Sequence, residues 1–210
     1  MSTIPRPLLI LALVAPLTCA AAPALELPVP FERDGAWGYV DRNGNVRIAP
    51  RFVLAQPFSS KGIAAVVDGR GWAYVGLDGS VLLRPLIVDN GPDYFSDGLA
   101  RFLEKGKVGF FGEDGKPAIP ASFDYATPFS EGLASFCAGC TQEPEGEHTR
   151  VAGGKWGYID AKGAVVIPAV FGEAGAFSGG CARVMRDGRQ FLIDRGGREL
   201  DEAAGCTGSR

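Results

Sequence analysis

The chain has 210 residues and a formal net charge of −3 at pH 7, with both signs scattered along it. A mildly acidic chain of this kind lacks the basic surface that nucleic-acid binding requires, so we expect no nucleic-acid partner. Its 30 glycines and 15 prolines are too many for a helical protein and indicate turns. The composition therefore favours a β-rich fold, and the length suits one domain.

Residues 1–24 are predicted to be a secretory signal peptide. Arg6 is the only charged side chain before an apolar run at 8–17, which is too short to span a bilayer as a helix. Small residues follow the run, as at a signal cleavage site. We expect cleavage after Ala24, and cleavage after Ala20 is the alternative.

The mature chain, 25–210, is then expected to be periplasmic or secreted and to contain no transmembrane segment. An alternative is a lipoprotein anchored through Cys19. Thr18, which precedes that cysteine, is bulkier than the residue usual there, so the lipoprotein is the less favoured interpretation.

A phrase centred on Trp-Gly recurs along the chain, as in WGYVDRNG and WGYIDAKG, at successive spacings of 35, 36, 48 and 34 residues. A second phrase, FS followed shortly by Gly, recurs out of step with it. A fixed period of this length is typical of a repeat array. The first phrase begins at Trp37, Trp72, Val108, Trp156 and Gln190, and the second at Phe58, Phe95, Phe129 and Phe177.

Each unit carries three strand signals, which we name C, A and B in chain order. Strand C follows the FS phrase, strand A contains Trp-Gly, and strand B follows a tight turn with a glycine. The units predicted from this pattern are 27–57, 58–94, 95–128, 129–176 and 177–202, with a tail at 203–210. The turn glycines are Gly44, Gly79, Gly115, Gly163 and Gly197.

The strand pattern places bulky apolar side chains on both faces of each predicted sheet, so neighbouring sheets should pack face to face. The glycine of Trp-Gly is expected to make room for a large side chain on the facing strand, with Phe102 opposite Gly109. The tryptophans are interpreted as repeat core rather than as a stacking ladder for a sugar or peptide. The predicted core comprises Trp37, Trp72, Trp156, Tyr39, Tyr158, Phe58, Phe95, Phe129 and Phe177.

We therefore expect an all-β fold in which five three-stranded antiparallel meanders form a tandem array within one domain. The array is predicted to be open or curved. A closed, five-bladed propeller-like arrangement is the alternative, but units of about 35 residues are short for blades that usually hold four strands.

The stretches at 155–168 and 121–136 carry a family resemblance. The pattern KWGYID followed by a turn, VVIP and then FSEGLA resembles the WG, or KWG, repeat of bacterial proteins, and the resemblance covers roughly 31–200. It implies an interaction scaffold and brings no catalytic residue and no cofactor. The fifth copy has lost both Trp and Gly and resembles a terminal cap.

Acidic residues recur before the turns at Asp41, Asp160 and Asp194. Aspartate at such places bonds to nearby backbone N–H groups, so we interpret these residues as turn formers rather than as paired catalytic carboxylates. No catalytic residue is predicted, and the protein is expected not to be an enzyme. The alternative is a hydrolase of envelope polymers that uses carboxylates at strand ends.

One segment, 137–153, interrupts the period with a 14-residue insertion and is predicted to be a loop. A metal site formed by Cys137, Cys140 and His148, or a redox site at the two cysteines, are alternatives to a structural disulfide. The mature chain has four cysteines, an even number that suits disulfides in an oxidising compartment. Three connectivities are open. We prefer the pairing of Cys137 with Cys140 and of Cys181 with Cys206, although Cys137 with Cys181 also stays open.

The preferred function is a non-catalytic binding or scaffold module of the periplasm or cell envelope, without metal or cofactor. Its partner is expected to be another envelope protein or a peptide. The acidic insertion is the candidate contact, because long loops on a rigid scaffold often carry binding residues. The residues proposed for this contact are Glu143, Glu145, Glu147 and His148.

Overall fold

A computed structural model describes residues 26–145, 148–201 and 206 of the chain. Within these residues all the regular structure is β, in 20 strands. No helix in this part of the chain is long and apolar enough to cross a bilayer. The predicted signal peptide, 1–24, and Cys19 lie outside the described residues.

The described strands form five antiparallel sheets of three or four strands, with a two-stranded sheet between the second and the third. The first sheet holds β1 (Val29–Arg33), β2 (Ala36–Val40) and β3 (Val46–Phe52), and the second holds β4 (Leu54–Ala55), β5 (Ala64–Asp68), β6 (Gly71–Val75) and β7 (Val81–Leu83). The small sheet is β8 (Ile87–Val88) and β9 (Gly91–Pro92). The third sheet holds β10 (Leu99–Glu104), β11 (Lys107–Gly112) and β12 (Pro117–Phe123).

The fourth and fifth sheets have four strands each. The fourth holds β13 (Tyr125–Ala126), β14 (Leu133–Glu145), β15 (His148–Asp160) and β16 (Val165–Phe171), and the fifth holds β17 (Glu173–Ala174), β18 (Cys181–Arg186), β19 (Arg189–Asp194) and β20 (Glu199–Leu200).

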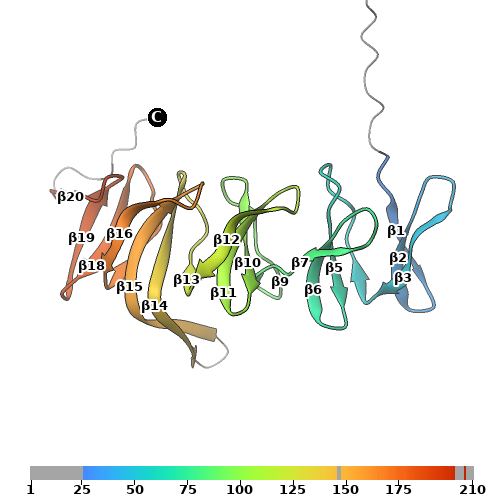
Figure 1. Cartoon of the computed structure of the whole chain (residues 1–210), viewed down its shortest axis with the longest axis horizontal. Helices are drawn as coiled ribbons and strands as arrows, with labels where there is room; N and C mark the ends of the chain where they lie inside the picture. The colour runs from blue at the N-terminus through green and yellow to red at the C-terminus, as the bar shows by residue number, and fades with distance from the viewer. Residues whose placement is uncertain (1–25, 146–147, 202–205, 207–210) are drawn as a thin grey trace, which may run out of the picture.

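The sheets follow one another in a row in chain order, from β1 at the right of Figure 1 to β20 at the left. The first and the last sheet lie at opposite ends of this row, and no sheet closes on itself. The predicted all-β, open array is therefore confirmed, and the propeller-like closure is not the arrangement of this chain.

A short additional strand joins successive sheets. Strand β12 pairs with β11 in the third sheet, and one residue later β13 pairs with β14 in the fourth. Strands β4 and β17 make the same step from the sheet before them. The three-stranded meander of the sequence analysis thus gains a fourth strand in three sheets, because strand B continues onto its neighbour.

The glycine of Trp-Gly is needed for the expected reason in the third sheet and for a second reason in the bulged sheets. Phe102 lies opposite Gly109, and a Cβ on this glycine would lie 2.6 Å from the Phe102 ring. In the first sheet, however, Trp37 pairs with Phe52 and Tyr39 with Ile48, so strand B bulges over the single residue Gly38. A Cβ atom there would lie 2.5 Å from the Ile48 carbonyl oxygen. The backbone of the bulge therefore excludes any larger residue at Gly38 and Gly157, and at Gly109 both the bulge and the facing Phe102 ring do so.

The second sheet shows what happens without this glycine. Ala73 occupies the position, and β7 ends at Leu83 without folding back over it. The chain then runs beside β10 of the next sheet, as it does beside the next sheet at the other junctions, and the Leu86 N–H donates to the Arg101 carbonyl at 3.0 Å. The small sheet β8–β9 follows from this altered path.

The core lies between successive sheets rather than inside each one. The clusters between the first and second, third and fourth, and fourth and fifth sheets contain nine, eight and nine buried residues. The cluster between the second and third sheets contains four, namely Leu83, Ala100, Phe102 and Phe111. The junction of the second and third sheets therefore has the smallest apolar cluster of the four.

The turn glycines contribute to the stacking of the sheets. All five have positive φ, between 74° and 81°. A Cβ on Gly163 would meet Ile119 of the preceding sheet at 2.9 Å, and one on Gly197 would meet Ile167 at 3.1 Å. Counted from the turn glycine, the exposed Asp201 of the fifth sheet takes the place that Ile167 takes in the fourth. The polar residue ends the apolar stacking, as expected of a terminal cap.

Candidate functional site

The predicted core residues lie at the junctions between sheets. Tyr39 and Tyr158 are fully buried, and their hydroxyls donate to the carbonyls of Gln56 at 2.7 Å and Gly175 at 2.8 Å. Burial raises the pKa of both phenols, so they stay neutral. The ring centroids of the FS phenylalanines lie close to the aromatic residue of the preceding strand A: 4.6 Å for Phe58, 6.4 Å for Phe95, 4.8 Å for Phe129 and 4.9 Å for Phe177.

The three tryptophans are partly buried, and two of them lie at the edges of these clusters. Trp37 packs against the cluster of the first and second sheets, and Trp156 against that of the fourth and fifth. The indole N–H of Trp72 donates to the carbonyl of Asn90 at 2.9 Å. Trp37 and Trp156 therefore take part in packing between sheets, and Trp72 is bonded within its own repeat.

The aspartates before the turns bond to the backbone of their own turns. Asp41 accepts from the N–H groups of Asn43 and Asn45, each at 2.9 Å, and Asp160 and Asp194 repeat the arrangement. The Asn45 side chain lowers the pKa of Asp41, and the Arg198 N–H lowers that of Asp194. The three carboxylates belong to the first, fourth and fifth sheets, where each closes a hairpin.

The cysteines are joined in the preferred pairing. Cys137 is bonded to Cys140 with 5.9 Å between Cα atoms, and Cys181 to Cys206 with 5.4 Å. In the described part of the chain no group of three or more His, Cys, Asp or Glu side chains could hold a metal ion. The side chains of Glu145, Glu147 and His148 lie outside the described residues, so the acidic contact is placed only in part.

The insertion is a regular hairpin and not a loop, which corrects the sequence analysis. Strands β14 and β15 have 13 residues each and pair as far as Glu145 with His148. The adjacent strands stop earlier, since β13 reaches only Cys137 and β16 only Trp156. Residues 138–145 and 148–155, which we name the ribbon, therefore pair with each other alone.

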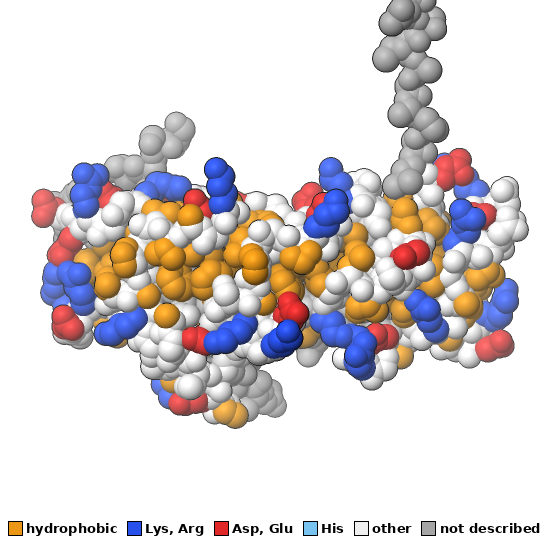
Figure 2. Space-filling model, viewed as in Figure 1, with side chains coloured by type: hydrophobic (Ala, Val, Ile, Leu, Met, Phe, Trp, Pro, Cys, Tyr) orange, Lys and Arg blue, Asp and Glu red, His pale blue; other side chains and the backbone are white. Residues whose placement is uncertain are grey.

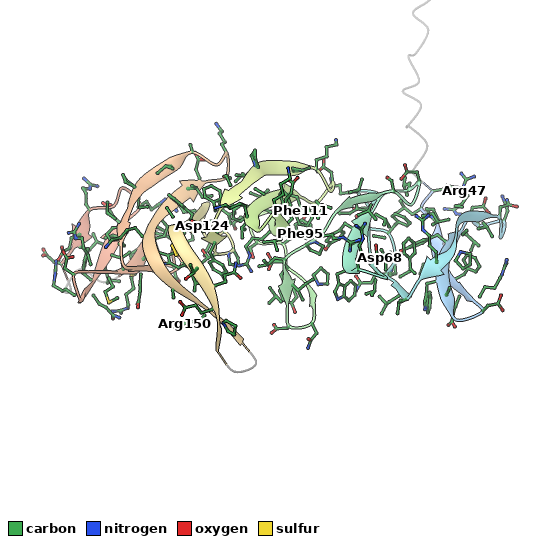
Figure 3. The ribbon with its side chains drawn as sticks, turned by 60° about the horizontal axis from the view of Figure 1, so that its bottom comes forward. Arg47, Asp68, Phe95, Phe111, Asp124 and Arg150 are labelled. Atoms are coloured by element: carbon green, nitrogen blue, oxygen red, sulfur yellow. A yellow bond between two sulfur atoms is a disulfide. The ribbon has the colours of Figure 1, made fainter. Side chains whose placement is uncertain are left out.

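Asp124 anchors the base of the ribbon. Its carboxylate accepts from the Gly139 N–H at 2.6 Å and forms an ion pair with Lys107 of the third sheet. The Lys107 hydrogen bond, followed by that of Gly139, holds the pKa of Asp124 below its usual value. Farther out, Glu143 pairs with Arg150 across the two strands at 3.0 Å. Figure 3 shows Asp124 near the root of the ribbon and Arg150 near its outer part.

The FS turns of successive sheets are bonded to one another. The Asp97 carboxylate accepts from the N–H of Gly132, in the next FS turn, at 2.7 Å. The Glu131 carboxylate accepts from the N–H groups of Gly179 and Gly180, at 2.7 and 2.9 Å. Sequence reasoning interpreted these turns as local features and missed the bonds between them. The acid before glycine in FSDG and FSEG is the signal that could have indicated them.

The model of the WG containing repeat matches this chain at residues 37–72, 109–139 and 156–189. The matched regions include Gly38, Gly109 and Gly157, the glycines under the strand B bulge. The chain is a WG-repeat protein. A comparison with the curated proteins finds no match for it.

This WG-repeat protein has a pocket of about 350 Å³ between its second and third sheets. The pocket is polar on one side, where Ser60, Lys61 and Glu113 line it, and aromatic on the other, where Tyr74 and Phe95 line it. The sequence analysis did not predict a pocket here. No repeat motif marks it, because it forms where the repeat pattern is altered.

The WG repeats also leave apolar side chains exposed. Figure 2 shows hydrophobic side chains along much of the array. Among the described residues, exposed valines and leucines occur on the edge strands β3, β7 and β16, at Val46, Val81, Leu82, Val165 and Val166. These side chains are spread over three sheets and so do not define a single binding position.

Proposed function

We propose that this WG-repeat protein is a non-catalytic binding scaffold of the periplasm or cell envelope, and that the ribbon holds its protein partner. One observation carries the proposal: residues 138–145 and 148–155 extend beyond the sheet to which they belong and pair only with each other. Both outer edges of the ribbon therefore carry backbone groups without a strand partner.

A partner strand can be added to such an edge. An extended peptide that joins a sheet edge gains affinity from main-chain hydrogen bonds, and side-chain pockets supply specificity. Pro144 lacks an N–H and so weakens one edge, that of β14. The edge of β15 at 150–155 contains no proline, and we assign the partner strand to it.

The base of the ribbon is held firmly enough for this role. The Cys137–Cys140 disulfide and the bond from Gly139 to Asp124 restrain the ribbon on the scaffold. A binding element that is ordered before the encounter loses less conformational entropy on binding. The rest of the array then serves to position the ribbon.

Export is supported by the sequence of the N-terminal segment and by the two disulfides. Residues 1–24 have the charge and hydropathy pattern of a signal peptide. Disulfides persist in oxidising compartments such as the periplasm and are rare in the cytosol. The partner is accordingly proposed to be another envelope protein with an extended segment.

The test shortens the ribbon to the length of the other hairpins. Residues 139–154 are replaced by Asp-Gly, and Cys137→Ala removes the unpaired thiol. Ala138 and Lys155 would then flank the turn as Glu104 and Lys107 flank theirs in the third sheet. We expect the melting temperature to fall only modestly, and proteins captured from an envelope extract by the intact chain to be lost.

A second variant separates backbone recognition from charge recognition. The double substitution Glu143→Lys with Arg150→Glu reverses the ion pair across the ribbon and leaves both strands in place. It should capture the same partners as the intact chain. An unchanged partner set with the shortened variant would contradict the assignment of the ribbon and move the search to the faces of the sheets.

A further inference from the structure

The FS turns of the third, fourth and fifth sheets have one backbone conformation. Their central pairs are Asp97-Gly98, Glu131-Gly132 and Gly179-Gly180, and all six residues have φ between 51° and 80°. Consecutive residues of this kind turn neighbouring N–H groups into a concavity that suits an anion. The Glu131 carboxylate occupies the last of the three, with one oxygen on each N–H.

The first of these three turns, Asp97-Gly98, differs from the last in the hydrogen bonding of its N–H groups. Nothing among the described residues accepts from the N–H groups of Asp97 and Gly98. The FS turn before it, at 59–62, has Lys61 before its glycine, where the later turns have Asp97 and Glu131. The carboxylate that the repeat supplies at the next two junctions is thus replaced by an ammonium group at this one.

The charged residue near Lys61 is also of opposite sign to the one near Glu131. At the junction of the fourth and fifth sheets, Glu131 lies beside Arg195, whose guanidinium donates to the Glu131 carbonyl. Glu113 occupies in the third sheet the turn position that Arg195 occupies in the fifth. Lys61 and Glu113 both line the pocket between the second and third sheets.

The two aromatic rings that line the same pocket lie farther apart than the equivalent rings at the other junctions. The Tyr74 and Phe95 rings lie 6.4 Å apart, against 4.6 to 4.9 Å for the equivalent pairs. The Tyr74 hydroxyl has no hydrogen-bond partner among the described residues, whereas those of Tyr39 and Tyr158 donate to carbonyls. Figure 3 shows Phe95 beside Phe111, which supports it from the third sheet.

We propose that this pocket binds a ligand carboxylate attached to an apolar group. The carboxylate sits beyond the pocket lining, on the exposed N–H groups of Asp97 and Gly98, which follow the lining residue Phe95 by two and three positions. The Glu131 carboxylate sits in the same way on Gly179 and Gly180, and Lys61 neutralises the charge of the ligand. The apolar group lies against Phe95 and Tyr74. Glu113 disfavours a second negative charge, so the ligand is a monocarboxylate. The proposal does not rest on the ribbon, which belongs to the fourth sheet.

The test is an NMR titration of the amide groups of the intact mature chain. Acetyl-Ala-Phe with a free carboxyl end represents a peptide C-terminus, and the α-amide of N-acetylglutamate represents an acidic side chain. We expect saturable downfield proton shifts at Asp97 and Gly98 with at least one probe, because hydrogen bonding to a carboxylate deshields an amide proton. The probe that binds more tightly identifies the source, and acetyl-Ala-Phe-amide should cause no such shift.

Two substitutions locate the site. Lys61→Ala should weaken binding about fivefold, whereas Lys162→Ala, at an exposed turn of the fourth sheet, should leave it unchanged. Lys61→Glu supplies a carboxylate before Gly62, and it should slow hydrogen exchange at the Asp97 and Gly98 amides and abolish probe binding. The proposal is overturned by an absence of saturable shifts at these two amides, by equal shifts with the amide probe, or by unchanged affinity in either Lys61 variant.

Discussion

The junction of the second and third sheets differs from that of the fourth and fifth, although both join the same kind of repeat. The former buries four core residues and the latter nine. In the latter the Tyr158 hydroxyl reaches the Gly175 carbonyl and the Glu131 carboxylate bonds to the next FS turn. In the former neither bond is made, and a pocket lies in their place. A few side chains thus decide whether neighbouring repeats are closed against each other.

The connection that runs from the second sheet to the third is held against β10 by a buried ion pair. Arg101 and Asp93 are 5% and 4% exposed, and the guanidinium bonds to both carboxylate oxygens at 2.8 Å. Arg101 also donates to the Ala126 carbonyl at 3.0 Å. Asp93 follows the small sheet β8–β9, so the altered path of strand B places this carboxylate next to Arg101. Only a fully paired arrangement of this kind is tolerated in a core.

The largest effect is expected from breaking this pair. Arg101→Met leaves the Asp93 carboxylate buried without its partner and should lower the free energy of unfolding by about 3–5 kcal/mol. Arg183 occupies the equivalent position in β18 and is exposed, so Arg183→Met should change it by less than about 0.5 kcal/mol. Urea unfolding of the two variants measures the difference, and equal losses would show that the pair does not hold the connection between the second and third sheets.

The next effect concerns the bulge, which the fourth sheet has and the second sheet does not. Gly157→Ala places a Cβ at 2.4 Å from the Ile167 carbonyl oxygen, so strand β16 must move. We expect a loss of about 3 kcal/mol, at the upper end of ordinary overpacking.

The reverse substitution in the second sheet, Ala73→Gly, is the matched control. It should cost about 1 kcal/mol, from backbone entropy in a strand and the lost methyl group. Thermal unfolding separates the two results. A Gly157→Ala variant as stable as the parent would mean that strand B does not press on this glycine.

A smaller effect on stability should distinguish Tyr158 from Tyr74. Tyr158→Phe removes the hydrogen bond that the buried hydroxyl donates to the Gly175 carbonyl, which should cost about 1 kcal/mol. Tyr74→Phe removes a hydroxyl that makes no such bond and should be nearly neutral. If chemical denaturation gave equal losses of unfolding free energy for both variants, the Tyr158 hydrogen bond would not distinguish the two junctions.

The smallest effect is a pH dependence at the base of the ribbon. Because the pKa of Asp124 is lowered in the folded state, its contribution is complete above the ordinary aspartate value of about 3.9 and is lost as the pH falls through the folded pKa. The partners are partly exposed, so we expect less than about 1 kcal/mol.

The measurement compares melting temperatures of the parent and of Asp124→Asn from about pH 6 down to about pH 2. Their difference should be constant above about pH 4 and should shrink below it. Hydrogen exchange at the Gly139 amide should become faster in the variant. A difference that does not change with pH would exclude the Asp124 carboxylate as the anchor.

Much of the fold followed from residues that act locally. The hairpin between Trp156 and Val165 could be predicted because Asp160 and Gly163 close their turn through bonds within five residues. The insertion was mistaken for a loop because neither TQEPEGEHTR nor its flanks show strand alternation. Its strands are instead defined by pairing with each other and by the disulfide beside Gly139.

The sequence by itself determined the all-β class, the repeat period and the turns, because each depends on the φ preferences and hydrogen bonds of a few consecutive residues. Only the tertiary structure decided which repeats are closed against each other. The bonds from Glu131 to Gly180 and from Arg101 to Asp93, and the pocket beside Lys61, join residues of different turns, strands or sheets. Such contacts depend on how neighbouring elements stack, and the repeats differ in their strand B, which bulges over Gly157 in the fourth sheet but not over Ala73 in the second.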